Sequence, residues 1–239
     1  MSLSVVIPAF DEAASIEWTI GVLREGLATL GDVEGDVEIV VVDDHSTDDT
    51  YALATALADK EGAPVRVLAP EGGHGLGAAI RRGLAAATGD LVFYTDADLP
   101  VDPTELGRLI GTLRRYDADV LCGYRFDRTF EGRRRAVQSH VYNGLIRAVL
   151  PVHIRDVNFA CKLMRRSAIE QVLPELRSDG PFIDAELVSR CSHHGFRVVQ
   201  VGVDYFPRFE GASTLGGPSA ISAILKEAVG LQRELRRRP

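Results

Sequence analysis

Short, continuous apolar runs alternate with helical patterns along the first half of this chain. Residues 39–42, within the expected strand at 37–42, and residues 91–95 are runs of this kind, which is typical of strands that are buried on both faces. Strands are expected at 4–8, 37–42, 65–69, 91–95 and 120–123, and helices at 12–30, 48–61, 75–87 and 103–116. The alternation predicts an α/β fold with a Rossmann-like, mostly parallel sheet and helices on both faces.

Acidic residues follow three of the expected strands, at the ends where ligands gather in parallel sheets: residues 8–12, Asp43-Asp44, and the Asp-Ala-Asp triplet 96–98. Residues one and three of an extended segment point the same way, and hard divalent cations prefer one or two carboxylates plus substrate phosphate oxygens. Asp96 and Asp98 are therefore candidate ligands for Mg²⁺ or Mn²⁺. The alternative is an ordinary turn after a strand, since Asp is common there.

The second acidic pair has its own two interpretations. Asp43 or Asp44 is a candidate partner for a nucleobase N–H or a ribose hydroxyl. Alternatively, Asp44 is an acidic partner for the N-terminus of the helix that Ser46 and Thr47 are expected to cap. Because three acidic elements at one sheet edge would repel one another without a cation, their convergence favours a metal and nucleotide site.

The charge of the chain is segregated along its 239 residues, although the sum is only -7. Residues 1–62 hold fourteen Asp and Glu against two basic residues, whereas residues 108–150 hold nine Arg against four acidic residues. The acidic sum argues against nucleic-acid binding. The Arg-rich stretch is either a solvated face or a phosphate-binding region, since Arg binds phosphate bidentately.

The cysteines and the hydropathy pattern bear on location. Cys122, Cys161 and Cys191 are odd in number and show no paired spacing, so neither a disulfide framework nor a zinc site is expected. No signal-peptide pattern opens the chain, and no window approaches the roughly 18 apolar residues that cross a bilayer. We therefore expect a cytoplasmic protein, peripheral at most at the inner face of a membrane.

A glycine-rich segment, residues 72–78, follows an expected strand and opens a helix, as a dinucleotide-binding fingerprint would. Its spacing differs from that fingerprint, and its strand is not the first of the chain. A hydride-transfer enzyme is therefore disfavoured. We expect the glycines to let the backbone approach a nucleotide or a neighbouring strand.

Four sequence blocks together resemble the family 2 glycosyltransferases, which have the GT-A fold: residues 5–12, 41–48, 75–79 and 94–99. Two later blocks, residues 156–163 and 182–187, resemble a narrower branch of that family, the polyprenyl- or dolichyl-phosphate mannosyl- and glucosyltransferases. The resemblance implies a GT-A catalytic domain at 1–216. A basic amphipathic tail without a transmembrane segment is then expected at 217–239.

The resemblance also implies roles for individual residues. The nucleotide is expected to contact Pro8, Phe10, Glu12, Asp43, Asp44, Gly75, Asp96 and Ala97, with Asp44 at the base. The metal ion, Mg²⁺ or Mn²⁺, is expected on Asp96 and Asp98. The acceptor phosphate is expected at Arg125, Arg133, Arg208 and Ser213, and the implied catalytic residues are Asp96, Asp98, Arg125, Asp184 and Arg208.

By the same resemblance, the chain is an inverting hexosyltransferase that moves mannose or glucose from GDP-mannose or a UDP-hexose to a polyprenyl phosphate. A phosphate monoester is already anionic at neutral pH, so Asp184 or Glu186 would then orient the arginines and the metal. A hydroxyl acceptor on a glycan or small molecule would instead need one of them as a base. A third interpretation of Asp184 and Glu186 is that one of them faces solvent on a helix. For the chain as a whole, the remaining interpretation is a non-catalytic nucleotide-sugar-binding protein.

Two basic amphipathic stretches suit a membrane-borne acceptor. The first is a helix expected from residue 137 until Pro151 ends it, with arginines 133–135 in its first turn. Its apolar stripe comprises Val137, Val141, Leu145 and Val149, with Ile146 and Leu150 beside it. The second is the tail at 221–235, which ends in several arginines. Both are interpreted either as surfaces for a peripheral membrane or homodimer contact, or as core helices with solvated basic ends.

Overall fold

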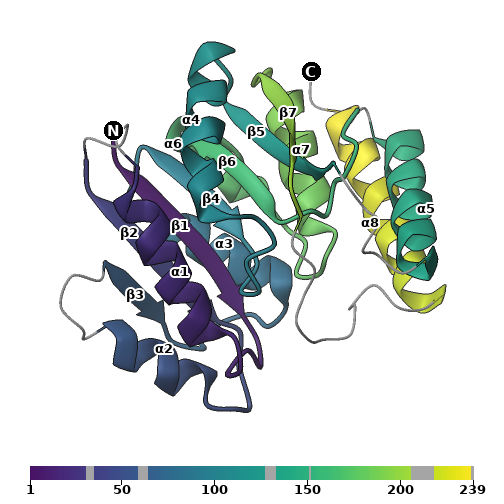
Figure 1. Ribbon diagram of the computed structural model, residues 1–239. Helices are drawn as coiled ribbons and strands as arrows, with labels where there is room; N and C mark the ends of the chain where they lie inside the picture. Colours follow the sequence, from purple (N-terminus) through teal and green to yellow (C-terminus); the bar gives the residue numbers. More distant parts are fainter. Residues whose placement is uncertain (31–34, 59–63, 127–132, 151, 206–217, 238–239) are drawn as a thin grey trace.

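One seven-stranded sheet runs through the part of the chain that the structure describes (Figure 1). The structure is a computed structural model and describes residues 1–30, 35–58, 64–126, 133–150, 152–205 and 218–237. The strands lie in the order β3-β2-β1-β4-β6-β5-β7. Their bounds are Leu3–Ala9 (β1), Val37–Asp43 (β2), Val65–Leu68 (β3), Leu91–Thr95 (β4), Val120–Arg125 (β5), Cys161–Arg165 (β6) and Val198–Val203 (β7).

The sheet is parallel except for one strand. Strand β1 pairs in parallel with β2 and β4, β2 pairs in parallel with β3, and β5 pairs in parallel with β7. Strand β6 is antiparallel to both of its neighbours, β4 and β5. The expected mostly parallel sheet is thus confirmed. Strands β6 and β7 were not predicted, because Lys162 and Arg165 interrupt the apolar pattern of β6 and β7 is only partly buried.

Helices cover both faces of the sheet, as expected. One face carries α1, α2 and α4, and the other carries α3, α5, α6, α7 and α8. The bounds are Ile16–Ala28 (α1), Thr50–Ala58 (α2), Leu76–Ala86 (α3), Leu106–Arg115 (α4), Arg133–Val149 (α5), Arg166–Val172 (α6), Ile183–His193 (α7) and Pro218–Leu235 (α8). Two short 3-10 turns precede α4 and α7, at Pro103–Glu105 (η1) and Leu173–Glu175 (η2).

The alternation of side chains along the central strands creates the two cores. In β1, Val6 packs with the α3 face, while Val5 and Ile7 pack with the α1 face. In β2, Val40 packs on the α3 face of the sheet and Val41 packs on the α1 face. All seven residues of β1 are buried, which is why the strand is apolar except for Ser4 and does not alternate.

Helix α5 begins with arginines 133–135, as expected, but turns a different face to the core. Tyr142, Ile146 and Leu150 are buried, whereas Val141 is 50% exposed. The predicted apolar stripe through Val141 is therefore wrong. The buried face lies one residue further along the helix, because α5 packs against α8 on that side (Figure 1).

Helix α8 directs its apolar side chains into the same core. Ile224, Ala228, Leu231 and Leu235 are buried against the rest of the chain, and the Gln232 side-chain amide donates to the Val149 carbonyl at the end of α5 (2.5 Å). These apolar side chains thus pack in the core of the chain itself. The expected boundary after residue 216 falls at 206–217, outside the described residues, and remains a prediction.

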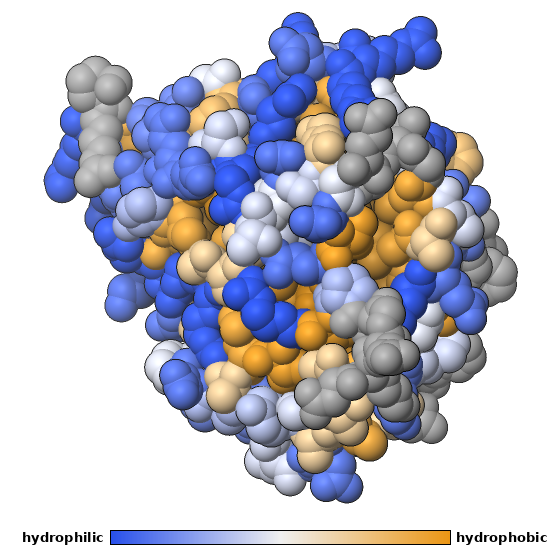
Figure 2. Space-filling view, turned by 90° about the vertical axis from the view of Figure 1, so that its left-hand side faces the viewer, coloured by the Kyte–Doolittle hydropathy of each residue, from blue (hydrophilic) through white to orange (hydrophobic). Residues whose placement is uncertain are grey.

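The surface at the β3 edge of the sheet mixes polar and apolar side chains. Figure 2 shows that side, where apolar residues are visible near the centre of the face between hydrophilic ones. Among the helices that the structure describes, none is long and apolar enough to cross a bilayer.

The three cysteines are free, buried thiols. Burial raises the pKa of Cys122 to about 11 and the pKa values of Cys161 and Cys191 to about 12. A rise of two pKa units lowers the thiolate fraction about 100-fold at pH 8, and the thiolate is the reactive form. We expect the native protein to react with a thiol reagent at least about 100-fold more slowly than the urea-unfolded chain, in which all three thiols should titrate. A thiol that reacts rapidly in the folded protein would contradict the buried placement.

Candidate active site at the carboxyl edge of the sheet

The strand order changes direction beside β1. The chain moves from β1 outward to β2 and β3 and then returns to β4 on the other side of β1, so the strand order reverses between β1 and β4. Ligands bind outside the carboxyl ends of strands at such a reversal. The β1–β4 ladder ends at the pair Val6 and Tyr94, and the Pro8 nitrogen carries no hydrogen to extend it. The ends of β1, β2 and β4 therefore meet at one open edge.

The Asp-Ala-Asp triplet lies at this edge, directly after β4, but in a turn and not in an extended segment. The Leu99 N–H donates to the Asp96 carbonyl (3.1 Å), and Leu99 has a left-handed backbone (φ 47°). The Thr19 hydroxyl of α1 donates to the Ala97 carbonyl (2.5 Å) and fixes the middle of the turn. The expectation of an extended triplet is wrong. Nevertheless, Asp96 and Asp98 remain half-buried at this edge of the sheet and offer only hard carboxylate oxygens, the donors that Mg²⁺ and Mn²⁺ prefer.

The loop after β1 is tied to the loop after β2. The Asp11 N–H donates to the Ser46 hydroxyl (3.0 Å), and the Thr47 N–H donates to the Asp11 carboxylate (2.7 Å). The Glu12 N–H donates to the Thr50 hydroxyl (2.8 Å). The two loops thus form one unit in which the Phe10 ring is 47% exposed at the edge.

These contacts correct the expected start of the second helix. Ser46 and Thr47 do not cap it, because their side chains bond to Asp11. The helix begins at Thr50, and the Asp48 carboxylate accepts a hydrogen bond from the Thr50 N–H (3.0 Å), the first N–H of the helix.

Asp43 and Asp44 are both buried at the end of β2, with 1% and 5% exposure. The Asp44 N–H donates to the Ala9 carbonyl (2.8 Å), and both Asp44 carboxylate oxygens accept from the Gly75 N–H (3.0 Å each). Asp44 is therefore an acidic partner for the N-terminus of a helix. That helix is α3, whereas the alternative interpretation had named α2. One Asp43 oxygen accepts from the Ser46 N–H (3.3 Å), and the other is buried with no hydrogen-bond partner in the described part of the chain.

The glycine-rich segment holds the backbone close to another loop. A Cβ atom at Gly75 would collide with the Asp179 carbonyl oxygen, and one at Gly77 would collide with the Ser178 carbonyl oxygen. Gly75 also has a left-handed backbone (φ 113°), which side chains disfavour. The close approach is thus to the loop before α7, and not to a neighbouring strand as one of the two expectations had it.

Arg125 lies at the end of β5, on the same edge as the acidic loops. Its guanidinium binds Asp156 through two nitrogens (2.7 and 3.0 Å) and lies over the rings of Phe159 and Tyr205 (5.2 and 5.3 Å). Asp156 is 2% exposed, so this pair fixes the guanidinium against the start of β6. The positioning role of Asp156 was not predicted, although the residue lies in the block that resembles the lipid-phosphate branch.

A buried ion pair stands behind this edge. The Lys162 ammonium lies 2.5 Å from an Asp184 carboxylate oxygen, and both side chains are at most 3% exposed. Burial raises the pKa of Asp184, and the Lys162 ammonium opposes that rise. Burial alone would lower the pKa of Lys162, but the Asp184 carboxylate outweighs it and raises that pKa. This pair was not predicted, and the only signal for it in the sequence is the lysine that interrupts the apolar residues of β6.

The Lys162 ammonium also holds the loop that carries Asp156. It donates to the carbonyls of Val157 and Phe159 (3.0 Å each), while the Val157 N–H donates to the Asn143 side chain of α5 (3.0 Å). Asp184 is therefore connected through Lys162 to the loop that positions Arg125. This arrangement suits a positioning role for Asp184.

Glu186 is buried as well, so the expectation that one of the two acids faces solvent is wrong. One Glu186 oxygen accepts from the buried Arg190 guanidinium (2.9 and 2.8 Å), and the other accepts from the N–H groups of Arg177 and Ser178 (2.9 and 2.8 Å). Both oxygens thus bind the protein itself, which leaves Glu186 a structural role in fixing the loop that Gly77 approaches.

Three expected acceptor residues cannot be placed in the site. Arg208 and Ser213 lie at 206–217, outside the described residues, and Arg133 begins α5 but its side chain is not among those described. The structure does bring together Pro8, Phe10, Glu12, Asp43, Asp44, Gly75, Asp96, Ala97, Asp98 and Arg125 at one sheet edge.

Comparison with known proteins agrees with this architecture. The family model described as glycosyl transferase family 2 matches residues 4–173. The chain is 33% identical over 211 residues to glycosyltransferase AglD of Haloferax volcanii, covering 87% of this chain and 34% of that protein. It is 30% identical over 237 residues to polyprenol monophosphomannose synthase of Mycolicibacterium smegmatis, and the match covers 94% of this chain and 84% of that protein. The chain thus spans about a third of the length of AglD.

Solved structures share the fold. A crystal structure of glucosyl-3-phosphoglycerate synthase from Mycobacterium tuberculosis, in complex with Mn²⁺, UDP-glucose and phosphoglyceric acid, superposes with a TM-score of 0.67. The sequences are 23% identical, and the match covers 96% of this chain and 80% of that one. The expected GT-A fold is thereby confirmed.

The glycine contacts generate a stability prediction. Gly77→Ala places a methyl group against the Ser178 carbonyl, and overpacking of this kind costs about 1–3 kcal/mol. Gly21→Ala is the matched control, because a Cβ atom there in α1 meets nothing within 4 Å. It should be neutral or stabilise the helix by up to about 1 kcal/mol. Urea unfolding measures both changes, and equal behaviour of the two variants would contradict the close approach.

The buried pair of Lys162 and Asp184 leads to a second prediction about stability. Asp184→Asn leaves the Lys162 ammonium buried without a counter-charge, which should lower the free energy of unfolding by about 3–5 kcal/mol. A double-mutant cycle with Lys162→Met, followed by urea unfolding, should return a coupling free energy of about 1–3 kcal/mol. Additive losses would show that the two groups do not stabilise one another.

Proposed function

Because this chain belongs to glycosyl transferase family 2, we propose that it is a metal-dependent, inverting hexosyltransferase that moves mannose or glucose from a nucleotide diphosphate sugar to a polyprenyl phosphate. The observation that carries the proposal is the meeting of the acidic loops after β1, β2 and β4 with Arg125 after β5 at one edge of the sheet. Acids suit a metal and a nucleoside, and an arginine suits phosphate. The name of the polyprenol monophosphomannose synthase supports the choice of acceptor.

On the donor side, Asp96 and Asp98 would hold Mg²⁺ or Mn²⁺. Their hard oxygen donors fit such an ion, and the similar mycobacterial structure was solved with Mn²⁺ and UDP-glucose. The ion would supply positive charge to the departing diphosphate. The turn fixed by Thr19 and Leu99 holds both carboxylates in place before the donor arrives, so little reorganisation is needed.

The nucleoside would lie over the ends of β1 and β2. The exposed Phe10 ring offers an apolar surface for a base, and the buried Asp43 oxygen without a described partner can accept a hydrogen bond from a base N–H or a ribose hydroxyl. Asp44, the proposed base contact, is oriented by Gly75. Pro8, Glu12 and Ala97 complete the proposed pocket.

On the acceptor side, Arg125 would bind the lipid phosphate, together with Arg133, Arg208 and Ser213. Asp156 and the two aromatic rings hold the Arg125 guanidinium, which reduces the entropy lost when phosphate binds. Asp184 would act as a positioning residue through Lys162, and not as a base, because its carboxylate is engaged in a buried ion pair. This fits a phosphate nucleophile, which needs no base at neutral pH.

A hydroxyl acceptor is the second candidate function. It is favoured by one observation, the fold shared with a synthase whose crystal structure contains phosphoglyceric acid. A hydroxyl nucleophile needs a base, and the two acids considered for that role, Asp184 and Glu186, are both engaged in buried ion pairs.

The experiment is nucleoside diphosphate release in the presence of Mn²⁺, with GDP-mannose and several UDP-hexoses, each with and without a short polyprenyl phosphate. We expect the polyprenyl phosphate to increase the rate of nucleoside diphosphate release from one of these donors. Asp96→Asn should lower that rate at least about 100-fold, the usual loss when charge stabilisation at a leaving group is removed. Asp117→Asn is the matched control, because its carboxylate is 90% exposed near the opposite edge of the sheet.

The two candidate functions give different results in this assay. Metal-dependent release that does not respond to polyprenyl phosphate would favour the hydroxyl acceptor. An absence of release with every donor would contradict transferase activity and support a non-catalytic nucleotide-sugar-binding protein.

A further inference from the structure

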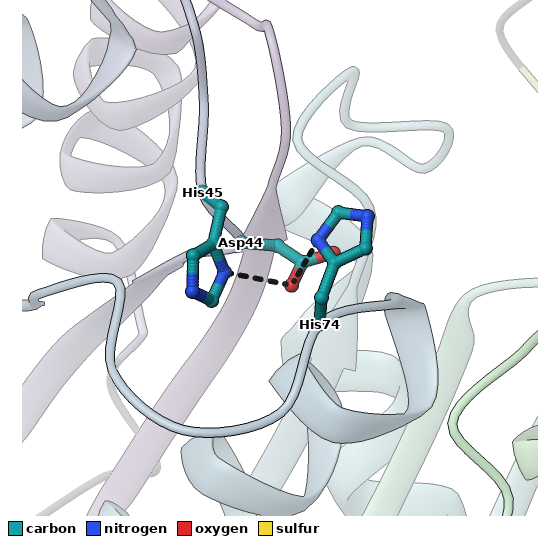
Figure 3. A group of neighbouring side chains, drawn as sticks. All are labelled: Asp44, His45 and His74. Atoms are coloured by element: carbon teal, nitrogen blue, oxygen red, sulfur yellow. Dashed lines mark ion pairs between the residues drawn. The ribbon is translucent and has the colours of Figure 1, made fainter.

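Two histidines converge on Asp44, a residue that also belongs to the proposed nucleoside pocket. His45 follows Asp44 directly after β2, and His74 precedes α3, so the group joins two segments that are distant in sequence. Figure 3 shows both imidazole rings turned toward the Asp44 carboxylate. One Asp44 oxygen lies 3.4 Å from His74 Nδ1 and 3.7 Å from His45 Nδ1, and the three ligand atoms all lie within 4.8 Å of one another.

Hydrogen bonding does not account for this convergence. Both separations exceed the roughly 2.7–3.2 Å of an N–H···O hydrogen bond. His45 Nδ1 is buried, and within the described residues it has no hydrogen-bond partner. A buried polar atom without a partner costs free energy, and a bound cation would offset that cost.

The two separations from Asp44 are close to those between the ligands of a metal ion. Zinc binds imidazole nitrogen at about 2.0–2.1 Å and carboxylate oxygen at about 2.0–2.2 Å, which places tetrahedral ligands roughly 3.3–3.5 Å apart. The distance from His74 to Asp44 already has this value, and the distance from His45 to Asp44 is a few tenths longer. The two imidazole nitrogens lie within 4.8 Å of each other, and rotation of these exposed rings would bring them to the same spacing.

The surroundings orient these ligands in advance. The Gly75 N–H donates to both Asp44 oxygens, which is the kind of hydrogen bond that fixes a metal-binding carboxylate. The left-handed backbone of His45 (φ 66°) is held between the Asp44 N–H bond to Ala9 and the Ser46 N–H bond to Asp43. The His74 side chain is 63% exposed, so an ion can reach the site from solvent.

We propose that Asp44, His45 and His74 form a binding site for a borderline divalent cation of the Zn²⁺ class. Two imidazoles and one carboxylate select Zn²⁺, Co²⁺, Ni²⁺ or Cu²⁺ over Mg²⁺ and Mn²⁺, in contrast to the all-oxygen pair Asp96 and Asp98. Three protein ligands leave a position open for water or another ligand. The site is proposed from its own geometry and does not depend on the transferase activity.

The test uses the full, tag-free chain without substrate and Co²⁺ as the probe. Visible absorption during the titration should show one bound Co²⁺ per chain, and added Zn²⁺ should abolish the signal by displacement. A tenfold excess of Mg²⁺ should leave the signal unchanged, because Mg²⁺ binds imidazole poorly. Absence of a Co²⁺ spectrum, or displacement by Mg²⁺, would overturn the proposal.

Variants assign the ligands. His74→Gln and His45→Asn should each weaken Co²⁺ binding at least about tenfold. Asparagine suits position 45 because it tolerates a left-handed backbone. His193→Gln, in the last turn of α7, is the matched control and should bind as the unmodified chain does. The two ligand side chains are 39% and 63% exposed, so an unchanged urea midpoint is expected. Binding that survives in both ligand variants would place the ion elsewhere.

Discussion

The parallel pairing of β1 with both β2 and β4 is the constraint on which the rest of the structure depends. Parallel strands present their carboxyl ends at one edge, so residues that follow β1, β2 and β4 must meet there, whatever their separation along the chain. The ladder between β1 and β4 stops before Pro8, which opens that edge. Strand β6 runs antiparallel beside β4, and it therefore begins at the same edge and brings Asp156 and Phe159 toward Arg125.

Behind the edge, buried charges fix the loops at specific positions. Lys162 and Asp184 connect β6, α7 and the loop before β6, while Arg190 and Glu186 hold the loop that the glycine-rich segment approaches. Such pairs add little net stability relative to apolar side chains, but the loss of one partner is costly, which makes alternative arrangements unfavourable. Asp44 is another buried charge that fixes a loop, because it binds the Gly75 N–H, and it is shared by the proposed nucleoside contact and the proposed cation site.

Much of the fold follows from local pattern. The runs that became β1, β2 and β4 are short and largely apolar because both faces of those strands are covered, and the helices between the strands have ordinary lengths. The errors came from positions where a tertiary partner decided. Ser46 and Thr47 bond to Asp11 instead of capping a helix, Val141 faces solvent because α8 covers the neighbouring face of α5, and the triplet forms a turn because Thr19 holds Ala97.

The sequence by itself determined the α/β class, the acidic residues after three strands and the family resemblance, because these depend on residue type and spacing along the chain. Only the tertiary structure decided which residues became neighbours. Asp44 meets His74 and Gly75, Arg125 meets Asp156, and Lys162 meets Asp184 across 20 or more residues of sequence. No local pattern encodes such distances, because they arise from strand order and register, which are set when the whole sheet assembles.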